Sequence, residues 1–346
     1  MKKGGNNVNA KRWIALGIVV ALLIVSAVTK ITSTLLASDE ETMSLTDSLM
    51  ALDSDVAEMV LEDGDGNNRI AVLTINGTIQ DTGSSDSLLG GSEGYNHTDF
   101  MDQLEKIRED DTVSGVLLNV NSPGGGVVES AQIRDKILQI KKEKKLPVYV
   151  SFGSMAASGG YYVSAPADKI FASPETLTGS IGVIMQGYDF SELMKKVGIS
   201  DNTIKSGKFK DIMSSTRPMT AEEKAIMQSM IDDSYGQFVK VVAQGRHMTE
   251  AEVRKIADGR IYDGRQAKAN GLIDAFGYEE NALDALKKDK KLKDAEVFEY
   301  DTSGGGLASL FSSSVSQVIG KKSEAEQAVQ LMNMMGAPRL MYMYGK

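Results

Sequence analysis

Short buried strands that run directly into glycine-rich loops recur through the middle of the sequence. The apolar run in VSGVLLNVNSPGGG, residues 113–126, ends in three glycines, and LPVYVSF, residues 146–152, is followed by GSMAASGG. Amphipathic helical patterns such as ESAQIRDKILQIKKEKK lie between the strands. Strands that alternate with helices in this way indicate a parallel sheet with crossover helices. The sequence therefore predicts an α/β fold from Arg69 onward, with its glycine loops at strand ends, where α/β proteins bind ligands.

The amino-terminal residues predict a membrane anchor. The uncharged apolar run WIALGIVVALLIVSAV follows four cationic residues. A run of about 16 to 20 apolar residues is at the short end for a spanning helix, and cationic residues before it favour an amino terminus inside the cell. We therefore expect a cytoplasmic segment at 1–12, a single transmembrane helix at 13–29 and an extracytoplasmic remainder. Cleavage as a signal peptide, after Ala27 or Ala37, is the alternative.

Composition excludes several classes of function. Lys and Arg number 38 against 47 Asp and Glu, a net charge of −9, which argues against nucleic acid as the main partner. The chain has no cysteine, so disulfides, thiolate catalysis and cysteine-ligated zinc are excluded. Residues 38–66 hold ten acidic side chains and no Lys or Arg, with apolar residues at roughly helical spacing. We expect a juxtamembrane helix or tether there.

The stretch SFGSMAASGGYYVSAP, residues 151–166, contains a candidate nucleophile. A strand that passes through small residues into a helix would expose the hydroxyl of Ser158 at the turn, as in the nucleophile elbow of hydrolases, although the G-x-S-x-G pattern itself is absent. Ser151 and Ser154 are competitors. A helix start lined by small residues for close packing is the structural alternative.

The loop NSPGGG at 121–126 leaves backbone N–H groups unobstructed at a strand end. A phosphate cradle is one interpretation, but the loop lacks the spacing and the Lys-Ser/Thr ending of a Walker motif. An oxyanion hole needs only N–H groups at a fixed position, so Gly125 together with Gly159 is the second interpretation. A plain structural turn is the third.

A base for Ser158 is harder to choose, because the chain has only two histidines. His97 and His247 both fall in loop-like stretches, which favours structural or solvated roles for them. A lysine can replace histidine as a base where burial disfavours its charged form. The stretch IKSGKFKDIMSS offers Lys205, Lys208 and Lys210, and spacing alone does not choose among them.

Four motifs in order, NSPGGG, SMAASGGYYVS, LTGSIGV and SGKFKD, resemble the S49 family of peptidases. The resemblance is to the short, Gram-positive form of signal peptide peptidase A, a membrane-anchored Ser-Lys protease. It implies that Ser158 is the nucleophile, Lys210 the general base, and Ser180 the group that orients the lysine. It also implies that Gly125 and Gly159 form the oxyanion hole.

The same resemblance covers roughly residues 70–290 and implies a ClpP/crotonase-like ββα spiral that needs no metal or cofactor. In double-length relatives the lysine and serine come from different repeats. A single-repeat chain is therefore expected to build each site from two neighbouring protomers of a closed homo-oligomeric ring. The implied substrates are remnant signal peptides, left after their release from preproteins, and other extended apolar peptides. Two rival functions stay open: a non-catalytic membrane scaffold that binds peptides, and an acyl-CoA hydratase.

These expectations divide the chain, after the anchor, into three parts. An acidic juxtamembrane segment occupies 30–68, the peptidase domain 69–300, and a flexible linker, short helix and tail 301–346. The tail ends in LMYMYGK. These apolar residues are predicted to bind a protomer's own substrate groove as an inhibitory or self-cleaved peptide. A disordered or packing terminus is the alternative.

Overall fold

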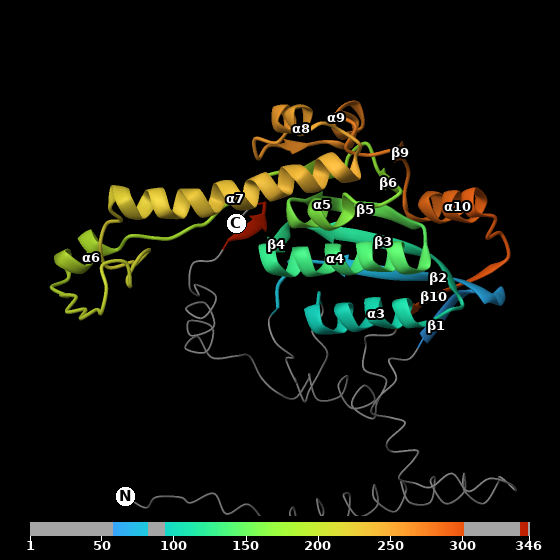
Figure 1. Ribbon diagram of the computed structural model, residues 1–346, viewed down its shortest axis with the longest axis horizontal. Helices are drawn as coiled ribbons and strands as arrows, with labels where there is room; N and C mark the ends of the chain where they lie inside the picture. Colours follow the sequence, from blue (N-terminus) through green and yellow to red (C-terminus); the bar gives the residue numbers. More distant parts are fainter. Residues whose placement is uncertain (1–57, 82–93, 301–339, 345–346) are drawn as a thin grey trace, which may run out of the picture. The chain divides into compact units, whose positions relative to one another are not determined.

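The computed structural model describes residues 58–81, 94–300 and 340–344 (Figure 1). The predicted transmembrane helix at 13–29 lies outside these residues, as do the linker and short helix predicted after residue 300. Of the two compact units into which the chain divides, the second, Val56–Lys346, contains all of them. None of the helices in the described ranges is long and apolar enough to span a bilayer.

The described residues form eleven strands and eight helices. The strands are β1 (Glu58–Glu62), β2 (Asp65–Asn76), β3 (Val113–Ser122), β4 (Gly124–Gly126), β5 (Val148–Ala157), β6 (Lys169–Ala172), β7 (Leu177–Gly179), β8 (Ile261–Tyr262), β9 (Ala275–Phe276), β10 (Ala295–Tyr300) and β11 (Met341–Met343). The helices are α3 (His97–Glu109), α4 (Val127–Lys144), α5 (Gly159–Ser164), α6 (Ser191–Lys196), α7 (Ala221–Gly245), α8 (Glu250–Ile256), α9 (Gly264–Ala269) and α10 (Glu279–Lys290).

A mainly parallel sheet organises the fold, as the alternating pattern predicts. Its order is β1-β10-β2-β3-β5-β6-β9, and every pair in this path is parallel except β1 with β10. Strand β7 adds to the far end of β5, and β8 pairs with β7. A separate two-stranded sheet joins β11 to β4. The mixed α/β class is thus confirmed.

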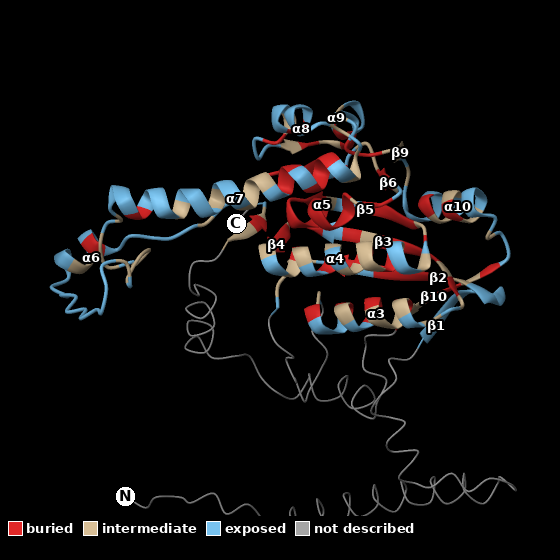
Figure 2. Cartoon of the chain, viewed as in Figure 1, coloured by how far each residue is buried: buried red, intermediate tan, exposed pale blue. Residues whose placement is uncertain are grey.

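Helices cover both faces of the sheet (Figure 2). Successive apolar side chains of each strand point to opposite faces, so both faces must be buried. In β2, Ala71, Leu73 and Ile75 belong to the large core shared with α3, α4, α5 and α7. Ile70 and Val72 belong to the smaller core under α10. Since each strand is buried on both sides, β2, β3 and β5 read as nearly continuous apolar runs.

Helix α7 is held by packing at its carboxyl end only. It begins with the predicted capping box, in which Thr220 and Glu223 bond each other's backbone N–H groups. Buried residues Phe238, Val239 and Val242 attach its last turns to the core. Most of its first half is exposed (Figure 2). The end that leads from α6 therefore makes few contacts with the sheet domain.

The helix or tether predicted for residues 38–66 is wrong where the structure describes it. Residues 58–62 form β1, which pairs antiparallel with β10. Arg69 on β2 fixes this pairing by ion pairs to Glu58 and, at 2.8 Å, to Glu296. The helical spacing of apolar residues is coincidental at this end, because pairing with β10, which is distant in the sequence, decides the conformation.

Candidate active site

Ser158 lies at the strand-to-helix turn that the sequence predicts, directly after β5 and at the N-cap of α5. Its φ and ψ of 53° and −114° are strained for a residue with a side chain. Two backbone hydrogen bonds hold this conformation: Ser158 donates to the carbonyl of Gly179 and accepts from the N–H of Tyr162, each at 2.8 Å. The side chain is 1% exposed, and its hydroxyl has no hydrogen-bond partner among the described residues.

The glycine loop β4 lies beside Ser158 and is fixed from two sides. The N–H of Gly124 donates to the Ser122 hydroxyl at 3.0 Å, and Ile79 bonds both Gly124 and Gly126 through its backbone. Gly124 has a φ of 100°, which favours glycine. Because α4 starts immediately after the loop, its positive amino-terminal end also faces this point.

The tail of the chain occupies the groove next to this loop. Strand β11 runs antiparallel to β4 and pairs Tyr342 with Gly125. On its other edge, Met341 exchanges two backbone hydrogen bonds with Ile184, at 3.0 and 3.1 Å. The N–H of Tyr344 donates to the carbonyl of Pro123 at 2.8 Å. The tail therefore packs against the glycine loop of its own chain, which agrees with the predicted groove binding and equally with its alternative, a packing terminus.

The side chain of Tyr342 fills an aromatic pocket that the sequence analysis did not identify. Its ring stacks on Tyr162 at 4.8 Å and lies 4.7 Å from Phe238, measured between centroids. The hydroxyl donates to the backbone carbonyl of Ser234 at 3.1 Å. The only sequence signal was the tyrosine pair after Ser158, since the Phe238 wall comes from α7, far along the chain.

The carbonyl of Tyr342 points at the predicted oxyanion hole. A Cβ built on Gly124 would lie 2.0 Å from this oxygen and 2.6 Å from the N atom of Gly159. A Cβ built on Gly159 would lie 3.0 Å from the same oxygen and 3.0 Å from the N atom of Gly125. The N atoms of Gly125 and Gly159 and the carbonyl oxygen of Tyr342 therefore lie close together, and Gly159 directly follows Ser158 in the chain.

Ser180 is brought to the same place by strand pairing. Strand β7 aligns Gly179 with Ala157, so the residues that follow, Ser180 and Ser158, are neighbours. Ser180 is buried, has a φ of 49°, and donates its N–H to the carbonyl of Arg260 at 2.8 Å. The two neighbouring serines, Ser158 and Ser180, thus both have a positive φ.

Lys210 is not brought to Ser158 within one protomer. It is exposed in the turns between α6 and α7, and Figure 1 shows α6 at the end of α7 that is distant from α5. Of the three candidate lysines, Lys205 pairs with Asp211 at 2.6 Å and Lys208 pairs with Glu222. Within the described ranges, Lys210 makes no hydrogen bond or ion pair with its side chain.

The turn that carries Lys210 is anchored to α7 by Arg217. This guanidinium bonds both carboxylate oxygens of Asp211, at 2.7 and 2.8 Å, and reaches Glu223 at 2.9 Å. These bonds hold the pKa of Asp211 well below its ordinary value, and lower that of Glu223 to about 2. Because Glu223 also caps α7, the same charged side chains hold the turn and the start of the helix together.

Comparisons with known proteins show the family of the chain. Residues 140–293 match the family model described as Peptidase family S49. A protein of Enterococcus faecium named "Putative signal peptide peptidase SppA" is 44% identical over 97% of this chain and 99% of its own length. The chain belongs to peptidase family S49.

Longer members of the S49 family are also similar to the chain. "Protease 4" of Salmonella typhi is 35% identical over 77% of this chain, and "Serine protease SPPA, chloroplastic" of Arabidopsis thaliana is 29% identical over 74%. The chain spans 42% and 38% of these two proteins. Membership in S49 identifies the chain as a serine peptidase, a hydrolase, and so decides against the hydratase alternative.

Neither histidine of this S49 chain bonds the Ser158 hydroxyl. His97 is buried at the start of α3, where its ring nitrogens bond the Tyr95 hydroxyl at 2.6 Å and Gln132 at 2.8 Å. His247 is exposed in the connection between α7 and α8. The structural or solvated roles predicted for both residues are confirmed.

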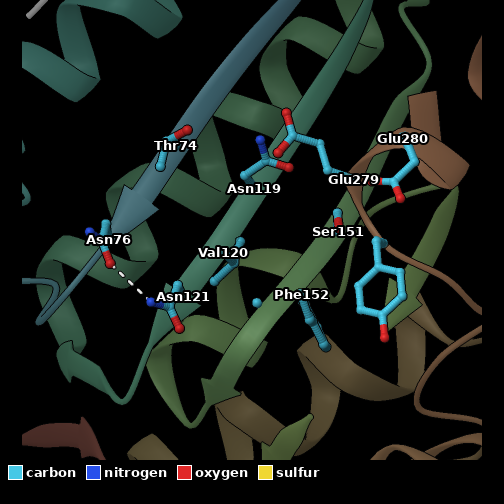
Figure 3. A pocket seen from close by; sticks show the side chains of 11 residues that line it. Thr74, Asn76, Asn119, Val120, Asn121, Ser151, Phe152, Glu279 and Glu280 are labelled. Atoms are coloured by element: carbon cyan, nitrogen blue, oxygen red, sulfur yellow. Dashed lines mark hydrogen bonds between the residues drawn. The ribbon is translucent and has the colours of Figure 1, made fainter. Parts of the chain in front are cut away.

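Both competing serines lie within β5, before the turn at Ser158. Ser154 is exposed on β5. Ser151 is buried in a polar pocket under the start of α10, beside Asn119 and two glutamates, Glu279 and Glu280 (Figure 3). The described lining of this pocket includes no lysine or histidine that could activate a hydroxyl. Of the three candidates, Ser158 alone adjoins converging N–H groups.

Proposed function

We propose that the chain is a membrane-anchored Ser-Lys endopeptidase that degrades remnant signal peptides. Ser158 is the nucleophile, Lys210 the general base, and Gly125 and Gly159 form the oxyanion hole. One observation carries the proposal: the carbonyl of Tyr342, in an extended strand, lies close to the N atoms of Gly125 and Gly159, and the Ser158 hydroxyl, one residue before Gly159, has no partner among the described residues. A substrate in that register would present its scissile carbonyl to the nucleophile.

The reaction follows from these positions. The neutral amine of Lys210 takes the proton of the Ser158 hydroxyl, whose oxygen attacks the carbonyl carbon. The Gly125 and Gly159 N–H groups stabilise the oxyanion. The lysine then returns the proton to the leaving amine, and water hydrolyses the acyl-enzyme. Ser180, next to Ser158 through strand pairing, orients the amine. Since a protonated ammonium cannot accept a proton, turnover should fall when the solution is acidified.

The lysine comes from a neighbouring protomer in this proposal. Lys210 is exposed, and neither its amine nor the Ser158 hydroxyl has a partner among the described residues. The segment around Lys210 also exposes apolar side chains, among them Val197, Ile199 and Ile204. An exposed apolar segment that carries an unused catalytic group suits contact with a second copy. We infer a closed homo-oligomeric ring of ClpP-like ββα spirals.

The groove supports extended apolar peptides as substrates. Backbone hydrogen bonds hold β11 on both edges, and its aromatic side chain enters a pocket lined by Tyr162 and Phe238. Signal-peptide remnants are apolar segments that would arise at the membrane. The apolar run at 13–29 would keep the ring at the outer surface of the cell membrane, with the amino terminus inside.

The docked tail supports self-inhibition or self-processing, with the bond after Tyr342 in the position for cleavage. Removing residues 335–346 should free the groove and raise the rate on added peptide. An unchanged rate would show that the tail does not compete with substrate.

The test of the proposed function uses the full-length protein in detergent and a fluorogenic peptide with tyrosine at the cleavage position. Turnover should vanish in both Ser158→Ala and Lys210→Ala while the oligomer, measured by light scattering, is retained. Lys205→Ala is the matched control from the same turn and should keep most of the rate. Normal cleavage by Ser158→Ala would show that another residue is the nucleophile, and an inactive parent would favour the peptide-binding scaffold.

Mixing the two inactive variants tests whether the site is shared. Co-expressed Ser158→Ala and Lys210→Ala protomers should regain up to about a quarter of parental activity, because one interface in four pairs an intact serine with an intact lysine. A site built within one protomer would regain nothing.

A further inference from the structure

A second hydroxyl near the proposed oxyanion hole also lacks a partner. Ser130 lies in the first turn of α4, which packs on α5. Its side chain has no exposed surface, and its Oγ atom makes no hydrogen bond to any described residue. Burying a hydroxyl without a partner costs about 1 to 3 kcal/mol, so native proteins rarely retain one without a reason.

The position of Ser130 suggests that reason. The point where a Cβ of Gly159 would lie is 2.7 Å from the Oγ of Ser130 and 3.0 Å from the Gly125 N atom. The carbonyl oxygen of Tyr342 is also 3.0 Å from that point. Ser130 therefore borders the same small space as the converging N–H groups and the peptide carbonyl.

We propose that the Ser130 hydroxyl is the third donor of the oxyanion hole. It donates a hydrogen bond to the carbonyl oxygen once attack by Ser158 makes that oxygen negative, and it keeps its own proton throughout. This inference rests on the proposed function of Ser158. No bond to the Tyr342 carbonyl is present in the ground state. A donor that engages only the displaced, charged oxygen would raise kcat rather than tighten peptide binding.

The contrary interpretation is that Ser130 is only a small residue that leaves room for Gly159. That interpretation predicts no effect of removing the hydroxyl, since alanine is equally small. It also predicts greater stability in Ser130→Ala, because an unsatisfied buried group is removed. Activity therefore separates the two interpretations, while stability does not.

The experiment compares full-length parent, Ser130→Ala, Ser130→Cys and a matched control, Ser164→Ala. Ser164 is equally buried on the neighbouring α5, but its hydroxyl already bonds the Gly160 carbonyl at 2.7 Å. We expect Ser130→Ala to lower kcat on the order of tenfold to a hundredfold with an unchanged KM. Ser130→Cys, with a weaker donor, should be intermediate. Ser164→Ala should lose stability and keep its kcat.

Inhibitor binding gives a readout that packing alone would not change. A peptide aldehyde, which forms a tetrahedral adduct with Ser158, should bind Ser130→Ala more weakly by a factor similar to the loss in kcat. The free peptide LMYMYGK should bind parent and variant equally. A parental kcat in Ser130→Ala, together with an inactive Ser158→Ala, overturns the third donor and leaves the proposed function standing. A parent without Ser158-dependent turnover overturns both.

Discussion

The turn around Ser158 and the turn around Lys210 differ in burial, in backbone conformation and in the bonds that hold them. The first is buried between β4, β7 and α5, with its backbone strained and bonded on both sides. The second is exposed at the distant end of α7 and is held by charged side chains. In the proposed mechanism the first region orders the nucleophile before substrate arrives, and the second presents the base to a neighbouring protomer. The comparison teaches that, on this proposal, one half of the site is formed by folding and the other half by assembly.

The largest expected effect comes from disturbing the buried half. A Cβ on Gly125 would lie 1.8 Å from the backbone oxygen of Ile79, a contact that no side-chain rotation relieves. Gly125→Ala should therefore reduce turnover by about a hundredfold or more and lower Tm. Gly207→Ala, in the exposed turn, would meet no atom within 4 Å and should keep the parental Tm. Equal Tm values for Gly125→Ala and Gly207→Ala in calorimetry would break the comparison.

Arg217→Ala tests whether the exposed half needs its charged scaffold. Loss of the bonds to Asp211 and Glu223 should misplace Lys210 and lower kcat by about tenfold, because small errors in position are costly in catalysis. Stability of the sheet domain should change little. Arg265→Ala, which removes an exposed pair with Glu175, is the matched control and should change neither quantity.

Acid should weaken the same scaffold. Arg217 lowers the pKa of Glu223 from its ordinary 4.5 to about 2, so the ionised pair stabilises the folded state above pH 4.5 and loses that contribution as pH falls toward 2. The difference in unfolding free energy between parent and Arg217→Ala should shrink over that interval. A constant difference in urea titrations would show that the bonds to Glu223 are not responsible.

The tail supplies a smaller effect on rate. Tyr342→Ala should empty the aromatic pocket, raise turnover of added peptide several-fold, and lower the unfolding free energy by about 3 kcal/mol, as for other buried aromatic residues. Tyr344→Ala removes an exposed ring two residues further on and should have little effect. Faster turnover in both variants would argue that the tail acts through its length rather than through the pocket.

Strain at Ser158 gives the smallest effect. Glycine tolerates the left-handed φ at this position, whereas alanine does not. Ser158→Gly should therefore be about 1 kcal/mol more stable than Ser158→Ala in denaturant unfolding, although both are inactive. The reverse order would mean that the turn is relaxed in the native state.

Sequence reasoning found the parts of the site that local pattern determines. Apolar runs and the capping box at Thr220 depend on neighbours within a few residues and were predicted correctly. The loop predicted after Phe152 is wrong, because β5 continues through it to Ala157. The turn at Ser158 was found because strand, small residues and helix follow each other directly. Assignment of the roles of Lys210 and Ser180 came from family resemblance, since neither spacing nor charge separates Lys210 from its neighbours.

The other features depend on contacts between residues far apart in the sequence, so local pattern did not predict them. Strand β1 is acidic and partly helical in its spacing, and it becomes a strand because β10 lies beside it. The aromatic pocket forms where Tyr162 of α5 contacts Phe238 of α7, two residues far apart in the sequence. Ser130 resembles any small residue of an amphipathic helix until the packing of α4 on α5 shows that its hydroxyl has no partner.

Because β11 is hydrogen-bonded on both edges, the groove selects peptides by their backbone conformation. A peptide bound as the tail is bound must be fully extended, so a helical segment has to give up its internal hydrogen bonds before it can be cut. Proline at the place of Met341 would lack the N–H that donates to Ile184. Such a peptide should be spared whatever its hydrophobicity, which would let a single proline protect an apolar segment from the enzyme.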